Sequence, residues 1–286
     1  MAEHVTICEV GPRDGLQNEA KFISTADKVR LIDLLSAAGL GYIEAASFVS
    51  PKLVPQMAGS KDVLARIKRK KGVVYSALAP NVRGYEDALK AGANEIAVFA
   101  SASETFSGKN INCTIDESLM RYQEICNRAK IDGIPVRGYV SCVAACPYEG
   151  PIAPEAVRRV AMSLIDMGCR EISLGDTVGA ATPDDIIKLL DCMLETIPAA
   201  RIAGHFHDTT GRALDCIRSA LDRGLRVFDS SVGGAGGCPF APGAKGNVAT
   251  GQAVQMFEAE GFATGVDAGA LKIATDFIIK LLGRKA

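Results

Sequence analysis

Short runs of β-branched and other apolar residues alternate with longer amphipathic stretches along the whole chain. Short apolar runs bounded by turn residues are typical of buried strands, whereas apolar positions repeating every three or four residues indicate helices that face a core. The pattern predicts eight strands, at Val5–Glu9, Tyr42–Ala46, Val73–Leu78, Glu95–Ala100, Val136–Ser141, Glu171–Leu174, Arg201–His205 and Val227–Ser231. It predicts helices after them, at Ala26–Ala38, Lys61–Lys70, Val82–Ala91, Ile115–Ile131, Pro154–Met167, Pro183–Ile197, Arg212–Arg223 and Asn247–Glu260.

The residues at the ends of these segments favour a closed parallel barrel. Thr182 offers a hydroxyl N-cap ahead of Pro183, and Thr114 stands at capping-box spacing from Glu117. Helices end in a glycine that can turn the chain toward the next strand, at Gly39, Gly92, Gly133, Gly168 and Gly224. The 286 residues are therefore predicted to form a single catalytic domain, an α/β protein with a (β/α)8 TIM barrel and an additional C-terminal helix, Asp267–Leu282. An open doubly wound sheet is the alternative.

Composition narrows the class of protein. The 32 Lys and Arg residues balance 33 Asp and Glu residues, so a nucleic-acid partner is not expected. The basic run Lys68–Lys71 is expected to end a helix, where cations suit the helix dipole. The 9 cysteines lack paired zinc-type spacing, and we see no targeting sequence and no apolar run long enough to span a membrane. We therefore expect reduced thiols and a cytoplasmic protein.

Polar residues at the ends of predicted strands indicate where the chemistry lies, because barrel enzymes carry their active sites on the face where the strands end. His205 and His207 stand two apart on one strand, so their side chains project to the same face. Two convergent imidazoles are typical of a metal site that needs a further oxygen ligand, and Asp14 follows the first strand at an equivalent height. The sequence thus predicts a divalent metal ion held by Asp14, His205 and His207; a hydrogen-bonded histidine pair is the alternative.

Two further residues are candidates for catalysis. Arg13 is expected to pair with Glu9 or Glu44, and an arginine held in this way could stabilise an oxyanion. Cys238 lies in a loop with glycines before it and prolines after it, which suits a loop that delivers a thiol on closure. The same glycines could instead cradle a phosphate.

At these residues the sequence resembles the 3-hydroxy-3-methylglutaryl-CoA (HMG-CoA) lyases. The resemblance covers nearly the whole chain and rests on Glu9–Glu19, Ser47–Lys52 with Val54–Met57, Arg137–Cys142, Cys146–Gly150, Glu171–Thr177 and the loop around Cys238. Arg-Asp-Gly and His-x-His-Asp alone mark a wider superfamily of lyases, synthases and carboxyltransferases. The long first motif and the Gly-Gly-Cys-Pro loop are specific to the lyases.

The resemblance implies cleavage of HMG-CoA, an acyl-CoA substrate, to acetyl-CoA and acetoacetate, with Mg²⁺ or Mn²⁺ as the cofactor. It implies Asn247 as a fourth metal ligand beside Asp14, His205 and His207. The implied catalytic residues are Arg13, Cys238 and His205, supported by the acids Glu44 and Asp176. The residues predicted to bind the substrate are Arg13, Gln17, Ser47, Ser173 and Thr177.

Some alternatives stay open. Ala235 and Lys245 depart from the usual lyase loop, which leaves room for a related 3-hydroxyacyl-CoA as substrate. A condensing synthase would share the barrel and the metal but usually has an additional C-terminal domain. A biotin-dependent carboxyltransferase would want a lysine in a barrel strand, and the predicted strands have none. A metal-binding scaffold or sensor is the non-enzymatic alternative, and a homodimer is the expected assembly.

Overall fold

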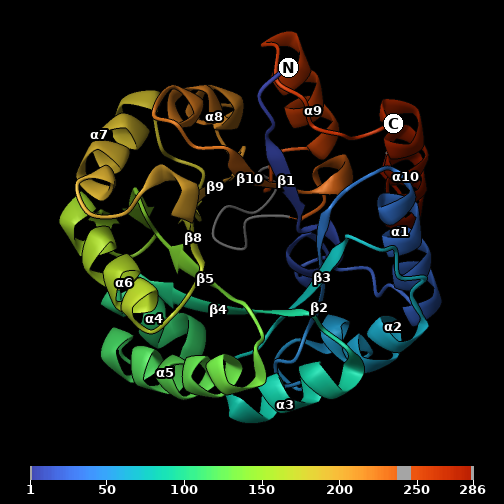
Figure 1. Ribbon diagram of the computed structural model, residues 1–286, viewed down its shortest axis with the longest axis horizontal. Coiled ribbons are helices and arrows are strands. Elements are labelled where there is room, and N and C mark those ends of the chain that lie inside the picture. The colour runs from blue at the N-terminus through green and yellow to red at the C-terminus, as the bar shows by residue number, and fades with distance from the viewer. Residues whose placement is uncertain (1, 237–245, 285–286) are drawn as a thin grey trace.

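The strands form a closed barrel, which confirms the predicted fold. The structure, a computed structural model, describes residues 2–236 and 246–284. Within this part of the chain, parallel strands close into a barrel in the order β1-β10-β9-β8-β5-β4-β3-β2 (Figure 1). They are β1 (Thr6–Glu9), β2 (Tyr42–Ser47), β3 (Val74–Leu78), β4 (Glu95–Ser101), β5 (Val136–Ser141), β8 (Glu171–Asp176), β9 (Ile202–Phe206) and β10 (Val227–Ser230). Because β1 pairs with both β2 and β10, the sheet has no open edge and the doubly wound alternative is wrong.

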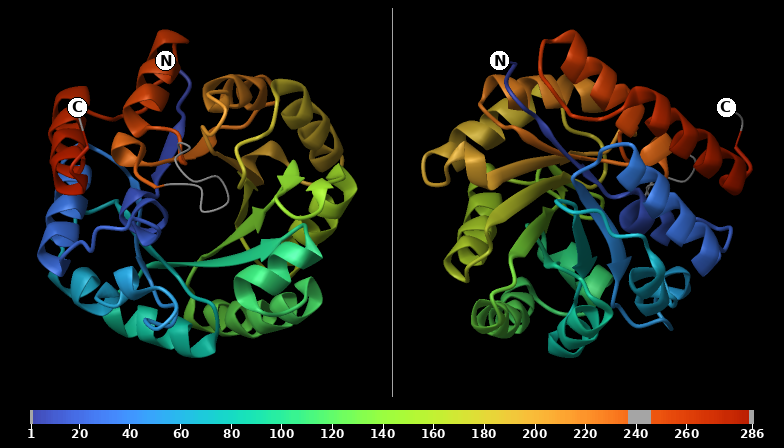
Figure 2. Two further views of the ribbon diagram at one scale, coloured as in Figure 1. Left: turned by 180° about the vertical axis from the view of Figure 1, so that it is seen from behind. Right: turned by 45° about the vertical axis from the view of Figure 1, so that its right-hand side comes forward.

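Helices surround the barrel as an outer ring (Figures 1 and 2). They are α1 (Thr25–Ala37), α2 (Ser60–Arg66), α3 (Val82–Ala91), α4 (Glu104–Ile111), α5 (Ile115–Asp132), α6 (Pro154–Asp166), α7 (Pro183–Leu194), α8 (Ala213–Asp222), α9 (Thr250–Ala259) and α10 (Ala268–Leu282). The predicted C-terminal helix is α10, and it packs beside α1, where the Arg30 guanidinium lies 4.8 Å from the centre of the Phe277 ring. In the described part of the chain, no helix is long and apolar enough to cross a membrane.

The predicted end signals act as expected. The Thr114 and Thr182 hydroxyls each accept a backbone N–H of the first helical turn, and a capping box forms at the N-terminus of α5 and of α7. The five glycines predicted to turn the chain have left-handed φ angles between 68° and 108°. These local signals place strand and helix ends close to their observed positions because they act within a few residues.

Two predicted helix bounds are wrong, and two elements were not predicted. The helix predicted for Lys61–Lys70 ends at Arg66, because Ile67 is extended and Asp33 accepts the Lys68 N–H instead, so the basic run lies beyond the helix. Helix α9 begins at Thr250 rather than at Asn247. Helix α4 was not predicted, nor was the short hairpin of β6 (Ala145–Cys146) and β7 (Gly150–Pro151).

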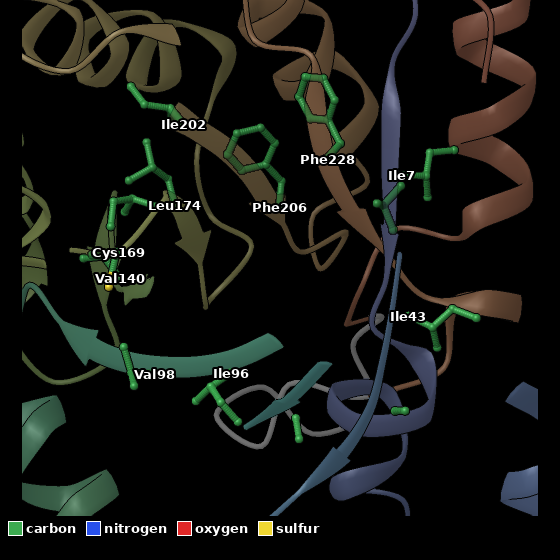
Figure 3. Packing of buried hydrophobic residues seen from close by; sticks show 14 of the residues in the cluster. Ile7, Ile43, Ile96, Val98, Val140, Cys169, Leu174, Ile202, Phe206 and Phe228 are labelled. Carbon is green, nitrogen blue, oxygen red and sulfur yellow. The ribbon is translucent and has the colours of Figure 1, made fainter. Parts of the chain in front are cut away.

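The two faces of the barrel wall differ in chemistry. Apolar side chains of the strands pack in the layer between the barrel and its helices, among them Ile7, Ile43, Ile96 and Phe228 (Figure 3). Residues alternating with these bear charged or hydroxyl side chains, and many are completely buried, such as Glu44, Arg137, Ser173 and Asp229. Since side chains two apart share a face, this second set fills the barrel. A polar interior requires the buried groups to pair with one another.

Candidate metal centre and active site

A single turn of π-helix, η1 (Gly11–Gly15), follows β1 and carries Arg13 and Asp14. The Gly11 N–H donates to Glu9 Oε1 over 2.8 Å, and the Gly15 N–H reaches back to the Val10 carbonyl over 3.1 Å. A side chain would crowd either end of the turn: a Cβ on Gly11 would lie 2.5 Å from Glu9 Oε1, and one on Gly15 would lie 2.6 Å from Ser231 Oγ. The turn therefore packs tightly against the β10 end of the barrel.

The two histidines and Asp14 converge as predicted. His205 ends up near Asp14 because β9 and β1 flank β10 in the barrel. His205 Nε2 lies 3.2 Å from His207 Nε2 and 4.0 Å from Asp14 Oδ2. One ligand atom from each of the three residues lies within 4.8 Å of the others. Neutral imidazole nitrogens and a carboxylate oxygen at this spacing fit a divalent cation.

The electrostatics of the cluster also suit a cation. Burial raises the pKa of Asp14, but the Arg13 guanidinium and the two histidines outweigh it and lower the pKa to about 2. Burial lowers the pKa of His207 to about 4, with His205 adding to the effect. The cluster therefore offers an ionised carboxylate and a neutral His207 near pH 7, which are the protonation states that bind a metal.

Asn247 lies in the cluster but not on a helix, contrary to expectation. It pairs with His207 in an isolated antiparallel bridge, three residues before α9 begins. Its amide Nδ2 donates to Asp14 Oδ2 over 2.8 Å and to the Ala235 carbonyl over 3.4 Å. The amide nitrogen thus faces Asp14, and ligation through the oxygen would need a half-turn of the amide.

Arg13 is held by two carboxylates. Its Nε lies 2.7 Å and its Nη2 2.6 Å from Glu44 Oε2, and its Nη1 lies 2.8 Å from Asp14 Oδ1. Of the two expected partners only Glu44 pairs with it, because the Glu9 carboxylate instead accepts the Gly11 and Val232 amides and the Thr250 hydroxyl. Burial raises the pKa of Glu44 although Arg13 opposes it. Arg13 is only 6% exposed, so its position is fixed.

The four other residues predicted to bind the substrate differ in their hydrogen-bond partners. Gln17 Nε2 lies 3.4 Å from Asp14 Oδ1, and the Ser47 hydroxyl is buried without a hydrogen-bond partner. Ser173 Oγ donates to Asp229 Oδ2 over 2.9 Å, and Thr177 Oγ1 accepts the Cys142 N–H. Their substrate contacts stay predictions.

The Asp176 carboxylate accepts the N–H groups of Gly179, Ala180 and Ala181, so it shapes the loop after β8. Burial raises its pKa against these three bonds. Cys238 lies outside the described residues, and so does Lys245.

The comparisons with known proteins agree with this site. The model of the family described as HMGL-like matches residues 4–278. The chain belongs to the HMGL-like family. Over 280 residues it is 52% identical to "Hydroxymethylglutaryl-CoA lyase, mitochondrial" of Arabidopsis thaliana, which covers 98% of this chain and 60% of that protein.

Other members of the family match over most of their length. Identity is 52% over 284 residues to "3-hydroxy-3-isohexenylglutaryl-CoA/hydroxy-methylglutaryl-CoA lyase" of Pseudomonas aeruginosa, covering 99% of this chain and 95% of that protein. The crystal structure of the HMG-CoA lyase from Brucella melitensis superposes with a TM-score of 0.97 at 57% identity, covering 99% of this chain and 100% of that one. The family membership implied by the sequence motifs is thus confirmed.

Sequence reasoning missed three charged residues inside this HMGL-like barrel. Arg137, Glu171 and Asp229 each lie within a predicted strand, and each is almost completely buried. Arg137 Nη2 donates to Asp229 Oδ1 over 2.7 Å, and Asp229 Oδ2 lies 3.0 Å from His205 Nδ1. The available signal was a charge inside a strand that should read as apolar.

Proposed function

We propose that the chain is a lyase that cleaves HMG-CoA to acetyl-CoA and acetoacetate with the help of a divalent metal ion. The observation that carries the proposal is the joint placement of Asp14, His205 and His207 beside a buried Arg13 at the end of the barrel strands. The proteins that share this sequence at about half of all positions are named as such lyases. The acyl-CoA thioester is the substrate class that follows.

The proposed cofactor is Mg²⁺ or Mn²⁺, held by Asp14, His205, His207 and the amide oxygen of Asn247. When bound, such an ion would polarise the oxygens of the substrate and make its 3-hydroxyl more acidic. The neutral His207 and the ionised Asp14 are the protein's contribution, because no proton has to leave either group near pH 7 before the ion binds.

The proposed role of Arg13 is to stabilise the enolate oxygen of the departing acetyl-CoA. Once the 3-hydroxyl has lost its proton, the hydroxyl oxygen forms the ketone of acetoacetate as the C–C bond between C2 and C3 breaks. The electron pair of that bond passes into the thioester, which leaves as an enolate. A guanidinium already aligned by Glu44 and Asp14 meets this charge without reorganisation. Glu44 is therefore proposed to act through Arg13.

Proton transfer is proposed to use Cys238. His205 has Nδ1 engaged by Asp229 and Nε2 facing the metal cluster, so ion binding leaves it no free nitrogen for a base. A thiol can take the hydroxyl proton or return a proton to the enolate carbon, which yields acetyl-CoA. Asp176 is proposed to support the site by shaping its loop, and Gln17, Ser47, Ser173 and Thr177 by contacting the substrate.

Three wider expectations belong to the same proposal. Residues 1–286 are proposed to form a single catalytic domain that works as a homodimer in the cytoplasm.

The test is an acetyl-CoA release assay with HMG-CoA, with and without Mg²⁺ or Mn²⁺. Metal-dependent release is expected, and Cys238→Ser should lower turnover by about 100-fold or more while metal binding is retained. A metal-binding scaffold would tolerate that substitution. Absence of cleavage by metal-loaded wild-type protein would refute the proposal.

A related 3-hydroxyacyl-CoA is the second candidate substrate. The Pseudomonas aeruginosa relative is named for both the isohexenylglutaryl and the methylglutaryl thioesters. The same assay with substrates that differ only in the C3 substituent distinguishes the two. We expect the highest kcat/KM for the methyl compound; a higher value for the longer chain would reassign the substrate.

A further inference from the structure

A chain of buried charges lies inside the barrel and ends at His205, and its other members, Glu171, Arg137 and Asp229, have no role in the proposed reaction. It runs from Glu171 through Arg137 and Asp229 to His205. These residues lie on β8, β5, β10 and β9, and the four strands stand in the order β10-β9-β8-β5 in the barrel (Figure 1). Arg137 has no exposed surface, and Glu171 and Asp229 are exposed by 3% and 2%. Charged groups so deep are costly unless each has a specific partner.

The Asp229 carboxylate has four polar contacts, three of them on Oδ2. Arg137 Nη2 donates to Oδ1 over 2.7 Å and Nη1 to Oδ2 over 3.1 Å. Ser173 Oγ donates to Oδ2 over 2.9 Å, and His205 Nδ1 lies 3.0 Å from that same oxygen. A carboxylate paired with a guanidinium is an acceptor only, so the His205 ring must donate its Nδ1–H.

We infer that Asp229 is a positioning residue that fixes His205 in the Nδ1–H tautomer and so presents the lone pair of Nε2 to the metal ion. The inference rests on the proposed metal site but not on the proposed reaction. The second histidine has no carboxylate behind it: among the described residues, no side chain bonds to His207 Nδ1, and its ring has a backbone contact at Thr177 instead. The two histidine ligands are therefore not equivalent.

Arg137 keeps Asp229 in place from below. Its Nε donates to Glu171 Oε1 over 2.7 Å and its Nη1 to the Tyr139 hydroxyl over 2.8 Å. The rings of Tyr42 and Tyr139 lie 5.5 and 5.0 Å from its guanidinium carbon. A guanidinium held on its edges and beside two rings cannot turn, so the Asp229 carboxylate has one orientation.

The decisive variant is Asp229→Asn. The new amide can still accept from Arg137 through its oxygen, but its NH₂ group would then face His205 Nδ1 as a donor. The ring would meet that donor with an unprotonated Nδ1 and carry its proton on Nε2, where it blocks the metal ion. Substitution of residues that orient a metal-bound histidine typically lowers metal affinity by about 10- to 100-fold.

The first measurement is the tautomer itself, without metal or substrate. Long-range ¹H–¹⁵N NMR of ¹⁵N-histidine-labelled protein, at a pH where the His205 ring is neutral, reports which ring nitrogen carries the proton. The spectrum is tractable because the chain has only three histidines. We expect Nδ1–H for His205 in the wild type and Nε2–H in Asp229→Asn, with His4 unchanged. An Nε2–H tautomer of His205 in the wild type would overturn the inference even if the variant failed to fold.

The second measurement is Mn²⁺ affinity, followed by the EPR signal of the free ion. We expect a loss of about 10- to 100-fold in Asp229→Asn. The matched control is Glu95→Gln, which removes another buried carboxylate of the barrel, paired with Arg170 and the Tyr42 hydroxyl instead of His205. Its Mn²⁺ affinity should stay within about twofold of the wild type.

The outcomes separate this inference from the proposed function. Folded Asp229→Asn protein with wild-type affinity, or an equal loss in Glu95→Gln, would refute a positioning role for Asp229. A wild-type protein that binds Mn²⁺ with the expected tautomer yet cleaves no thioester would refute the proposed reaction and leave the inference intact.

Discussion

Glu9 shows at the residue scale how one buried carboxylate joins separate parts of the barrel end. Its oxygens accept the Gly11 and Val232 amides and the Thr250 hydroxyl, and so connect the turn η1 with the segments after β10. Burial raises the pKa of Glu9 from 4.5 to about 7, although all three bonds act to lower it. Folding therefore shifts Glu9 toward its protonated form, compared with the unfolded chain.

This shift predicts how stability depends on pH. Because the folded pKa lies above the unfolded one, the stabilising contribution is complete below about pH 4.5 and is lost as the pH rises through about 7. The loss amounts to roughly 3 kcal/mol. We expect Glu9→Gln, which cannot ionise, to remove this slope. Urea unfolding of metal-free wild type and variant between about pH 4.5 and 8 measures the difference, and equal slopes would contradict the assignment.

At the scale of an element, the π-helical turn η1 places two reactive side chains in five residues. The wide turn sends the Arg13 side chain to Glu44 and the Asp14 side chain to the histidines, while Gly15 packs against the segment after β10. Turns of this kind interrupt regular structure and are often found at functional sites. The turn keeps its place only while Gly15 has no side chain.

Gly15→Ala should therefore move Asp14 and weaken metal binding. The added Cβ would meet Ser231 Oγ at 2.6 Å and the backbone oxygen of Ala235 at 3.0 Å, and a backbone atom cannot turn aside as a side chain can. A displacement near 1 Å at a catalytic site can cost about 100-fold in rate. We expect at least a tenfold loss in Mn²⁺ affinity and in turnover.

The matched control is Gly41→Ala, before β2, where an added Cβ meets nothing within 4 Å. Both properties should stay close to wild type in that variant. Equal effects of the two substitutions would show that alanine disturbs the fold in general, and normal activity of Gly15→Ala would refute the close approach at η1.

At the scale of the whole molecule, the side chains that could hold the metal ion come from both sides of the place where the barrel closes. Asp14 follows the first strand, His205 lies on β9, and Asn247 belongs to the segment before α9. An ion that joins these segments would bind the folded chain and not the unfolded one. Metal binding should then stabilise the entire fold.

Thermal unfolding tests this linkage. At a Mn²⁺ concentration of 100 times Kd we expect about 2.7 kcal/mol of added stability and a Tm higher by several degrees. His207→Ala should lose the increase, whereas His4→Ala, at an exposed residue outside the cluster, should keep it. An unchanged Tm in wild-type protein with saturating Mn²⁺ would contradict the metal site.

Much of this organisation was predictable because it depends on local patterns. Strand and helix positions follow from apolar periodicity, and the five turn glycines follow from a conformation that few other residues adopt. The side-by-side placement of His205 and His207 needs only the two-residue repeat of a strand. The early end of α2 was missed because Asp33, far along the chain, takes the Lys68 amide.

The sequence by itself thus determined the barrel, the shared direction of His205 and His207, and the family. Tertiary structure alone decided that Arg13 pairs with Glu44 across 31 positions, that Asn247 bridges to His207, and that Asp229 joins Arg137 to His205. These contacts depend on which strands become neighbours and on their register, since a shift of one residue would turn each side chain to the opposite face of the wall. No local pattern encodes which strands become neighbours or in what register they pair. Both are determined only when the barrel closes.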